Sequence, residues 1–198
     1  MPADTSALPE PPAARRAYGV YRICLVCLGN ICRSPMAEMV LRDELGRAGL
    51  AGLAEVDSAG TGDWHVGQPM DRRARAELDR RGYDGSAHRA RQFQPSWFGQ
   101  RDLVLALDRS NLADLRDMAP DADAAGPRLL LLRAFDPALA GPAEQAAADP
   151  YQGEVPDPYG GQPGDYALAL DLVQAAVRGL TGRLAGLLDV PATGAGGG

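Results

Sequence analysis

Hydrophobic positions in this chain follow two periods, which alternate along the sequence. Nearly continuous apolar runs are typical of strands buried on both faces, and they occur at 20–27, 54–59, 103–107 and 128–132. Apolar residues at helical spacing occur at 34–49 and 165–188. Two further helices are predicted, an Arg/Glu-rich one at 71–81 that ends before Gly82 and one at 110–118. Buried strands alternating with helices predict one α/β domain of three layers, a four-stranded parallel sheet flanked by helices.

The last of these helices has the most regular pattern. Over 165–188 the apolar side chains form one stripe, which consists of Leu168, Leu172, Val173, Val177, Leu180, Leu184 and Leu187. Such a stripe is typical of a helix that packs along its whole length against a core. The pattern therefore predicts a long amphipathic helix over 165–188.

A single domain over 18–189 suits a chain of 198 residues. Residues 1–17 are rich in Pro and Ala and predict a disordered arm, and 190–198 predict a flexible tail. The longest irregular stretch is 135–164, within which 136–156 is interpreted as an insertion.

The charge pattern excludes several classes of protein. All 20 basic residues are Arg against 26 acidic residues, and no basic run occurs, which argues against a nucleic-acid binder. No run approaches the ~18 apolar residues of a membrane span, and the first residues lack the apolar region of a secretory signal. We therefore expect a cytoplasmic protein that does not bind membranes, and we expect a monomer.

The three cysteines, at 24, 27 and 32, lie within one short stretch, which indicates a reactive or metal-binding site rather than a disulfide framework. Cys24 and Cys27 form a C-x-x-C motif, typical of a redox pair or half a zinc site. Their odd separation in a strand places the two thiols on opposite faces, and no second cysteine pair exists. We expect Cys24 to be a core residue, and we expect neither a metal nor a cofactor.

The first strand runs directly into the sequence CLGNICRSP at 27–35 and then into a helix. Gly29 and Asn30 permit a tight or left-handed turn, while Ser34 suits the N-cap and Pro35 the first helical position. A turn of this kind points backbone N–H groups inward, and the helix dipole adds to their field. The segment predicts a cradle for an oxyanion.

Cys27 and Arg33 supply the chemistry of this cradle. The inward N–H groups, the helix N-terminus and Arg33 all favour a thiolate at Cys27, and the Ser34 hydroxyl can hydrogen-bond to the sulfur. Arg33 can hold two oxygens of a phosphate. A nucleophilic cysteine and an arginine at this spacing predict covalent phosphoryl transfer.

The longer pattern resembles the low-molecular-weight protein tyrosine phosphatases. The resemblance rests on 27–38, on VDSAGTGDWHVG at 56–67, on AHRARQ at 87–92, on LDRSN at 107–111 and on DPY at 157–159, and it covers roughly 19–188. It implies the flavodoxin-like fold of that family, hydrolysis of phosphotyrosine in proteins through a cysteinyl phosphate, and no cofactor.

The resemblance also implies roles for individual residues. Cys27, Arg33 and Asp157 are expected to be catalytic. The expected substrate-binding residues are Leu28, Gly29, Asn30, Ile31, Cys32, Ser34, Trp64 and Tyr159. Asn30 is expected to hold the loop through hydrogen bonds to Ser34, Ser58 and His88. For Cys32 two roles stay open, as a trap for an oxidised Cys27 and as loop packing.

Two Asp-Pro-Tyr sequences compete for the role of general acid, one starting at Asp149 and the other at Asp157. We favour Asp157, because Val155 and Pro156 precede it as in relatives and because it reaches the last helix at the family's usual distance. Asp149 then belongs to the insertion. Gly160 stands where many bacterial relatives carry a second Tyr, so that wall of the pocket is expected to be thinner.

Other functions remain as alternatives. Phosphoarginine phosphatases share the loop but carry Thr at the position of Ile31. A thioredoxin-coupled arsenate reductase needs cysteines after Cys32, and none follows; a thiol-cofactor-coupled reductase would need none. A catalytically silent phosphotyrosine-binding module is the alternative from a different class.

Overall fold

A computed structural model of the chain describes residues 8–15, 19–121, 126–140 and 146–188. Its sheet has the strand order β2-β1-β3-β4, and every pair is parallel. The strands are β1 (Tyr21–Cys27), β2 (Ala54–Gly60), β3 (Leu103–Ala106) and β4 (Leu129–Leu131). The α-helices are α1 (Arg33–Arg47), α2 (Arg72–Arg80), α3 (Arg109–Met118) and α6 (Pro163–Leu188). Short 3₁₀ helices lie at Pro95–Gly99, Gly126–Arg128, Leu132–Phe135 and Pro137–Leu139.

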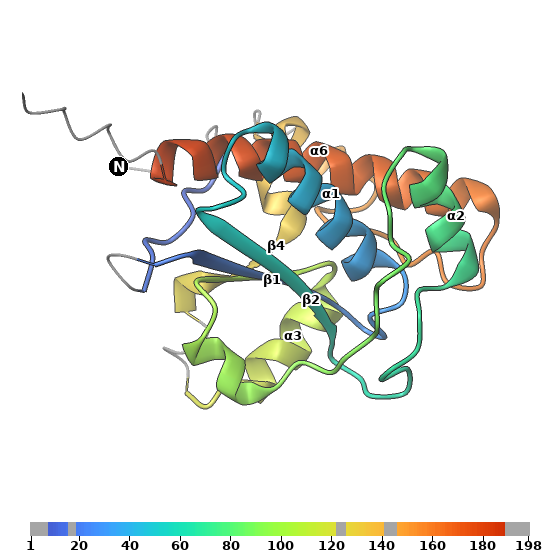
Figure 1. Cartoon of the computed structure of the whole chain (residues 1–198), viewed down its shortest axis with the longest axis horizontal. Helices are drawn as coiled ribbons and strands as arrows, with labels where there is room; N and C mark the ends of the chain where they lie inside the picture. Colours follow the sequence, from blue (N-terminus) through green and yellow to red (C-terminus); the bar gives the residue numbers. More distant parts are fainter. Residues whose placement is uncertain (1–7, 16–18, 122–125, 141–145, 189–198) are drawn as a thin grey trace, which may run out of the picture.

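The predicted three layers are confirmed. Helices α1 and α6 lie on one side of the sheet and α3 on the other (Figure 1). Strand β1 contributes to a separate apolar cluster on each face, with Ile23 and Leu25 in one and Cys24 and Val26 in the other. A strand buried on both faces has no polar alternation, which is why the sequence shows a continuous apolar run.

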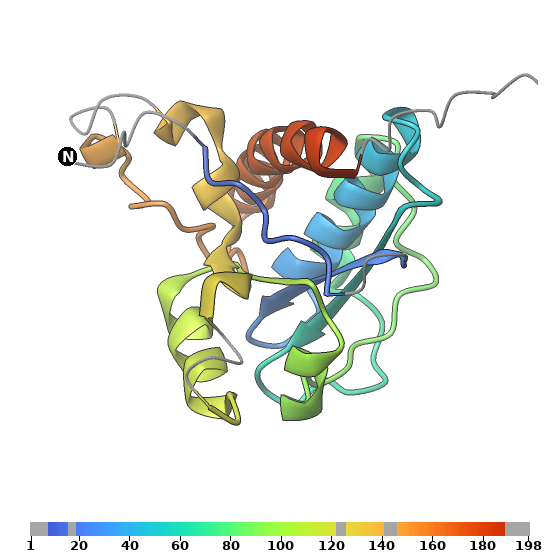
Figure 2. The same ribbon diagram turned by 90° about the vertical axis from the view of Figure 1, so that its left-hand side faces the viewer.

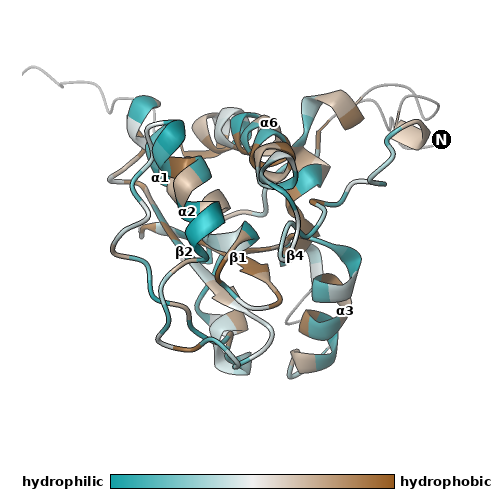
Figure 3. Cartoon of the chain, turned by 90° about the vertical axis from the view of Figure 1, so that its right-hand side faces the viewer, coloured by the Kyte–Doolittle hydropathy of each residue, from teal (hydrophilic) through white to brown (hydrophobic). Residues whose placement is uncertain are grey.

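The ends of the helices depart from the predictions in small ways. Helix α6 begins at Pro163, two residues before the predicted start. Of the predicted stripe, Val173, Val177, Leu180 and Leu184 are buried. Leu168 and Leu172 are only partly buried and Leu187 is 38% exposed, whereas Leu170, which the stripe did not include, is buried. Asp108 caps α3 by accepting a hydrogen bond from the Asn111 N–H. Helix α2 is mostly hydrophilic (Figure 3), because it buries little beyond Ala74 and Leu78.

Residues 8–15, which belong to the arm expected at 1–17, pack on the domain (Figure 2). The Tyr21 hydroxyl donates to the Pro12 carbonyl at 2.9 Å, and the Arg15 N–H donates to Asp102 at 2.6 Å. Arg183 of α6 forms an ion pair with Glu10. The Pro-rich composition of the arm disfavours helices and strands, and 8–15 contains neither. The segment can still form hydrogen bonds to the folded domain. Residues 1–7 and 16–17 of the expected arm, and the expected tail at 190–198, lie outside the described residues.

The parallel sheet brings its carboxyl ends to one edge. Cys27 at the end of β1 is paired with Gly60 at the end of β2, and Asp108 follows β3. Ligands of open parallel sheets bind at such an edge. Within the part of the chain that the structure describes, no helix is long and apolar enough to cross a membrane.

Candidate active site

The 27–33 loop joins the end of β1 to the start of α1 and encloses the candidate site. Asn30 in this loop has φ 54°, a left-handed conformation that asparagine tolerates. Cys27 is 2% exposed, and its Sγ lies 3.0 Å from the Ser34 hydroxyl. Helix α1 then begins at Arg33, with its N-terminus directed at the loop that carries the thiol.

The prediction that Ser34 caps α1 is wrong. The helix begins one residue before it, and no side chain among the described residues caps its N-terminus. The Ser34 hydroxyl instead contacts Cys27 Sγ, accepts a hydrogen bond from Asn30 Nδ2 and donates to the Ala59 carbonyl at 3.1 Å. Its single proton can serve either the carbonyl or the sulfur. The first-turn amides therefore keep their hydrogen-bonding capacity for an anion.

The Asn30 side chain lies behind the loop and bonds to the residues that the resemblance to the family implied. Its Nδ2 donates to Ser34 Oγ and to Ser58 Oγ, both at 2.9 Å, and its Oδ1 accepts from the Arg91 N–H at 2.9 Å. His88 contacts the backbone carbonyl of Asn30 at 2.8 Å through Nε2. These bonds satisfy every polar atom of a fully buried side chain and offset the cost of its left-handed backbone.

Glu38 extends this network and was missed at the sequence level. It is 6% exposed, and its carboxylate accepts a hydrogen bond of 2.5 Å from the Ser58 hydroxyl. Glu38 lies one helical turn after Ser34, so both side chains project from the same face of α1. The four-residue spacing from Ser34 was the feature of the sequence that could have indicated a role for Glu38.

Arg33 is 3% exposed and binds two carboxylates. Its Nη2 lies 2.9 Å from Asp157, and its Nη1 lies 2.5 Å from Asp108 and 3.2 Å from the Val155 carbonyl. Burial lowers the pKa of Arg33, but its interactions with Cys27, Asp157 and Asp108 together raise that pKa above its ordinary value. The guanidinium therefore stays charged inside the protein. The sequence analysis did not predict the ion pair with Asp108, because the two residues lie 75 positions apart in the chain.

The two Asp-Pro-Tyr sequences occupy different places. Asp157 reaches Arg33, whereas Asp149 forms an ion pair with buried Arg133 at 2.8 Å and accepts hydrogen bonds from the N–H groups of Tyr151 and Gly153. Of the expected insertion, the structure describes 136–140 and 146–156. Asp149 is anchored there, away from the 27–33 loop.

A cavity of about 120 Å³ opens above the thiol. Of the expected substrate-binding residues, Leu28, Gly29, Ile31, Cys32, Trp64 and Tyr159 line it, together with Cys27, Arg33 and Asp157. Asn30 and Ser34 do not, because their side chains lie behind the loop. Trp64 and Tyr159 are 66% and 59% exposed and form the aromatic walls.

His65 also lines the cavity, and the sequence pattern indicated no role for it there. Its ring lies so close to Gly29 that a Cβ at that glycine would stand 3.0 Å from His65 Cδ2. Its Nδ1 is 2.8 Å from Gln68 Oε1, which fixes the orientation of the ring. The position of His65 next to Trp64 in the sequence was the only signal.

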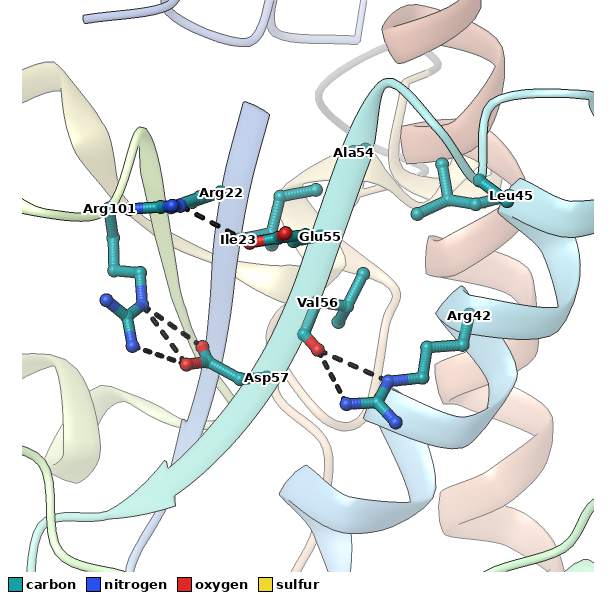
Figure 4. Close-up of a pocket in the computed structure, with 10 residues that line it drawn as sticks. Arg22, Ile23, Arg42, Leu45, Ala54, Glu55, Val56, Asp57 and Arg101 are labelled. Carbon is teal, nitrogen blue, oxygen red and sulfur yellow. Dashed lines mark hydrogen bonds and ion pairs between the residues drawn. The ribbon is translucent and has the colours of Figure 1, made fainter. Parts of the chain in front are cut away.

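A larger cavity of about 510 Å³ lies beside β2, at the edge of the sheet (Figure 4). The arginines that line it already bind oxygen atoms of the protein. Arg42 donates to the Val56 carbonyl at 2.9 Å, and Arg101 pairs with Asp57. No cysteine lines this cavity, so the smaller cavity above Cys27 is the candidate active site.

Comparison with known proteins shows the family to which a chain with this site belongs. The family model described as low molecular weight phosphotyrosine protein phosphatase matches residues 22–187. This chain belongs to that family.

Named members of this phosphatase family match over most of their length. A low molecular weight protein-tyrosine-phosphatase of Streptomyces coelicolor is 51% identical over 161 residues, which cover 81% of this chain and 91% of the relative. The low molecular weight protein-tyrosine phosphatase A of Mycobacterium tuberculosis is 37% identical over 158 residues, which cover 80% and 88%. The resemblance to the family and its bacterial members is thus confirmed.

Solved structures confirm the phosphatase fold. The crystal structure of a protein tyrosine phosphatase from Entamoeba histolytica has a TM-score of 0.72 and 30% identity, and the match covers 83% of this chain and 96% of the other. YfkJ from Bacillus subtilis also has a TM-score of 0.72 and 30% identity, with 85% and 97% covered.

The three cysteines of this phosphatase-family chain are buried and unpaired. Cys24 lies in the apolar cluster on the opposite face of the sheet from Cys27, as the C-x-x-C spacing predicted. Burial raises the pKa of both Cys24 and Cys32 far above its ordinary value, and the charge of a nearby aspartate, Asp57 or Asp71, raises it further. Both remain thiols at neutral pH.

Proposed function

We propose that this protein hydrolyses phosphotyrosine in proteins, with Cys27 as nucleophile, Arg33 as phosphate ligand and Asp157 as general acid and base. The observation that carries the proposal is the meeting of these three side chains at one small cavity, with Arg33 and Asp157 2.9 Å apart. Family membership and the named relatives support the reaction class. We further propose that the protein acts as a cytoplasmic monomer and binds no nucleic acid.

In the first step the Cys27 thiolate attacks phosphorus in line with the tyrosine oxygen. The S–P bond forms as the P–O bond breaks, while Arg33 and the loop amides hold the three other oxygens. The leaving phenolate is basic, since its conjugate acid has a pKa of about 10. When the phosphate takes the place of Asp157 on Arg33, the freed carboxyl group can carry a proton, which it gives to that oxygen as tyrosine departs neutral.

In the second step water displaces the cysteine. Asp157, now a carboxylate, accepts a proton from the attacking water as the new O–P bond forms and the S–P bond breaks. Inorganic phosphate and the Cys27 thiolate result. The Ser34 hydroxyl, 3.0 Å from the sulfur, stabilises the departing thiolate by turning its proton from the Ala59 carbonyl to Sγ.

Arg33 and the amide groups can neutralise the phosphate charge without a metal ion. We therefore expect turnover to survive treatment with EDTA. The proposed substrate is a protein, because the exposed Trp64 and Tyr159 leave the cavity open toward a chain that carries the phosphotyrosine.

The proposal is tested by phosphate release from a phosphotyrosine peptide at about pH 6. A phosphoarginine substrate is measured beside it, and Cys27→Ser serves as the inactive variant. Faster turnover of phosphotyrosine, abolished by Cys27→Ser, supports the proposal. Faster turnover of phosphoarginine favours the phosphoarginine phosphatase. If neither substrate is turned over, the phosphatase assignment is overturned, and arsenate reduction with a thiol cofactor is the next assay. Binding of the phosphotyrosine peptide without turnover would indicate a catalytically silent module.

A further inference from the structure

The indole of Trp64 rests directly on Gly62. A Cβ added at Gly62 would lie 1.7 Å from Trp64 Cζ3 and 2.2 Å from Cε3, far inside contact distance. Gly62 is not among the glycines with positive φ, so no left-handed backbone conformation requires glycine at this position. The indole is therefore the feature that requires glycine at this position.

The backbone beneath the indole is tied to the catalytic loop. The Gly62 N–H donates to the Leu28 carbonyl at 2.9 Å, and the Thr61 N–H donates to the Cys27 carbonyl at 2.8 Å. These two bonds tie the segment just after β2 to the end of β1 and the start of the 27–33 loop. An added side chain at Gly62 cannot move this backbone cheaply, so the exposed indole must move instead.

Trp64 forms one wall of the cavity that holds Cys27, and Tyr159 forms another. An aromatic ring entering between such walls gains contact energy that depends on ring offset and tilt. The position of the indole therefore decides how well a phosphotyrosine ring fits, whereas the phosphate contacts lie deeper, at Arg33 and the loop amides.

We propose that Gly62 is a positioning residue for phosphotyrosine recognition, because its missing side chain seats the Trp64 indole at a fixed place relative to Cys27. The inference rests on the proposed function and concerns the selection of aryl phosphates over phosphates that carry no ring. Gly62 does not touch the substrate and acts through Trp64.

The kinetics of Gly62→Ala distinguish a role in positioning the Trp64 indole from a general loss of active-site structure. We expect the KM for a phosphotyrosine peptide to rise by roughly 2- to 10-fold, with kcat nearly unchanged and the inhibition constant of inorganic phosphate unchanged. Gly46→Ala is the matched control, since it adds the same methyl group to α1 where nothing lies within 4 Å. An unchanged KM in Gly62→Ala, or an equal loss of phosphate binding, overturns the proposal.

A double-mutant cycle tests the route through the indole. In a Trp64→Ala background, Gly62→Ala should change KM no further, and an additional loss contradicts the proposal. Trp97 is the second of the two tryptophans, so Trp97→Phe leaves an emission signal from Trp64 alone. We expect Gly62→Ala to shift the emission of Trp64. An unshifted spectrum, measured without substrate, would contradict the claim that Gly62 fixes the position of the indole. Absence of turnover in the wild type would instead overturn the proposed function.

Discussion

Arg33 and Asp157 form an ion pair of 2.9 Å, although 124 residues separate them in the sequence. The pair brings the C-terminal part of the irregular stretch onto the loop after β1. Arg33 is also bound to Asp108, which follows β3. One buried guanidinium thus joins three separate segments at the edge of the sheet.

The first prediction concerns the two Asp-Pro-Tyr sequences. Asp157→Ala should lower kcat on phosphotyrosine by about 10²- to 10⁴-fold, because the phenolate must then leave unprotonated. The loss should be smaller for aryl phosphates with acidic leaving groups, and steady-state kinetics on such a series measures it.

Asp149→Ala is the matched control for that experiment. It should retain kcat, but it leaves buried Arg133 with one carboxylate partner fewer, and the free energy of unfolding should fall by about 1–3 kcal/mol. Strong loss of turnover in Asp149→Ala with retention in Asp157→Ala would reverse the assignment.

Asn30 allows hydrogen bonding and backbone strain to be separated. Asn30→Ala and Asn30→Gly both remove the side-chain bonds to Ser34, Ser58 and the Arg91 N–H, so both should lower kcat/KM, by roughly 5- to 100-fold. Glycine tolerates φ 54° without strain, and Asn30→Gly should be more stable than Asn30→Ala by about 1 kcal/mol. Full activity in either variant would show that these bonds do not support the loop.

Gly179 predicts a stability effect in α6. A Cβ there would lie 1.9 Å from the Phe135 carbonyl oxygen, so Gly179→Ala should lower the free energy of unfolding by roughly 1–3 kcal/mol. Gly182 in the same helix has nothing within 4 Å, and Gly182→Ala should stabilise by about 0.5–1 kcal/mol. Chemical denaturation of both variants checks the prediction, which fails if they change stability in the same direction.

Removal of residues 1–14 should lower the melting temperature without altering kcat or KM. The deleted segment contains the Pro12 carbonyl that binds Tyr21, at the amino end of β1 and so at the opposite end of the strand from Cys27. Tyr21→Phe should destabilise the full chain and have less effect on the truncated one. Equal melting temperatures of the full and truncated chains would show that the docked arm contributes nothing.

Features that depend on neighbouring residues could be predicted from the sequence. The buried strands, the turn at Gly29 and Asn30, and the placement of Cys24 and Cys27 on opposite faces all follow from local periodicity and backbone preference. The loop from Cys27 to Arg33 is equally local, so its residue types and their spacing were sufficient to indicate the chemistry.

Some side chains have more than one possible hydrogen-bonding partner, and only the tertiary structure decided which partner each of them binds. Ser34 suits a helix cap, yet it turns inward, because a buried thiol and a buried amide stand within reach of its hydroxyl. Asp149 and Asp157 share the local sequence Asp-Pro-Tyr, and only the resemblance to relatives favoured Asp157. The path of the chain places Asp157 at Arg33 and Asp149 at Arg133.

Contacts between distant segments depend on chain path and burial, which a local pattern does not encode. The docking of 8–15 and the indole of Trp64 on Gly62 belong to this class. The sequence by itself determined the fold class and the reactive loop of this protein. The fold decided which carboxylate meets that loop and how the aromatic wall is seated.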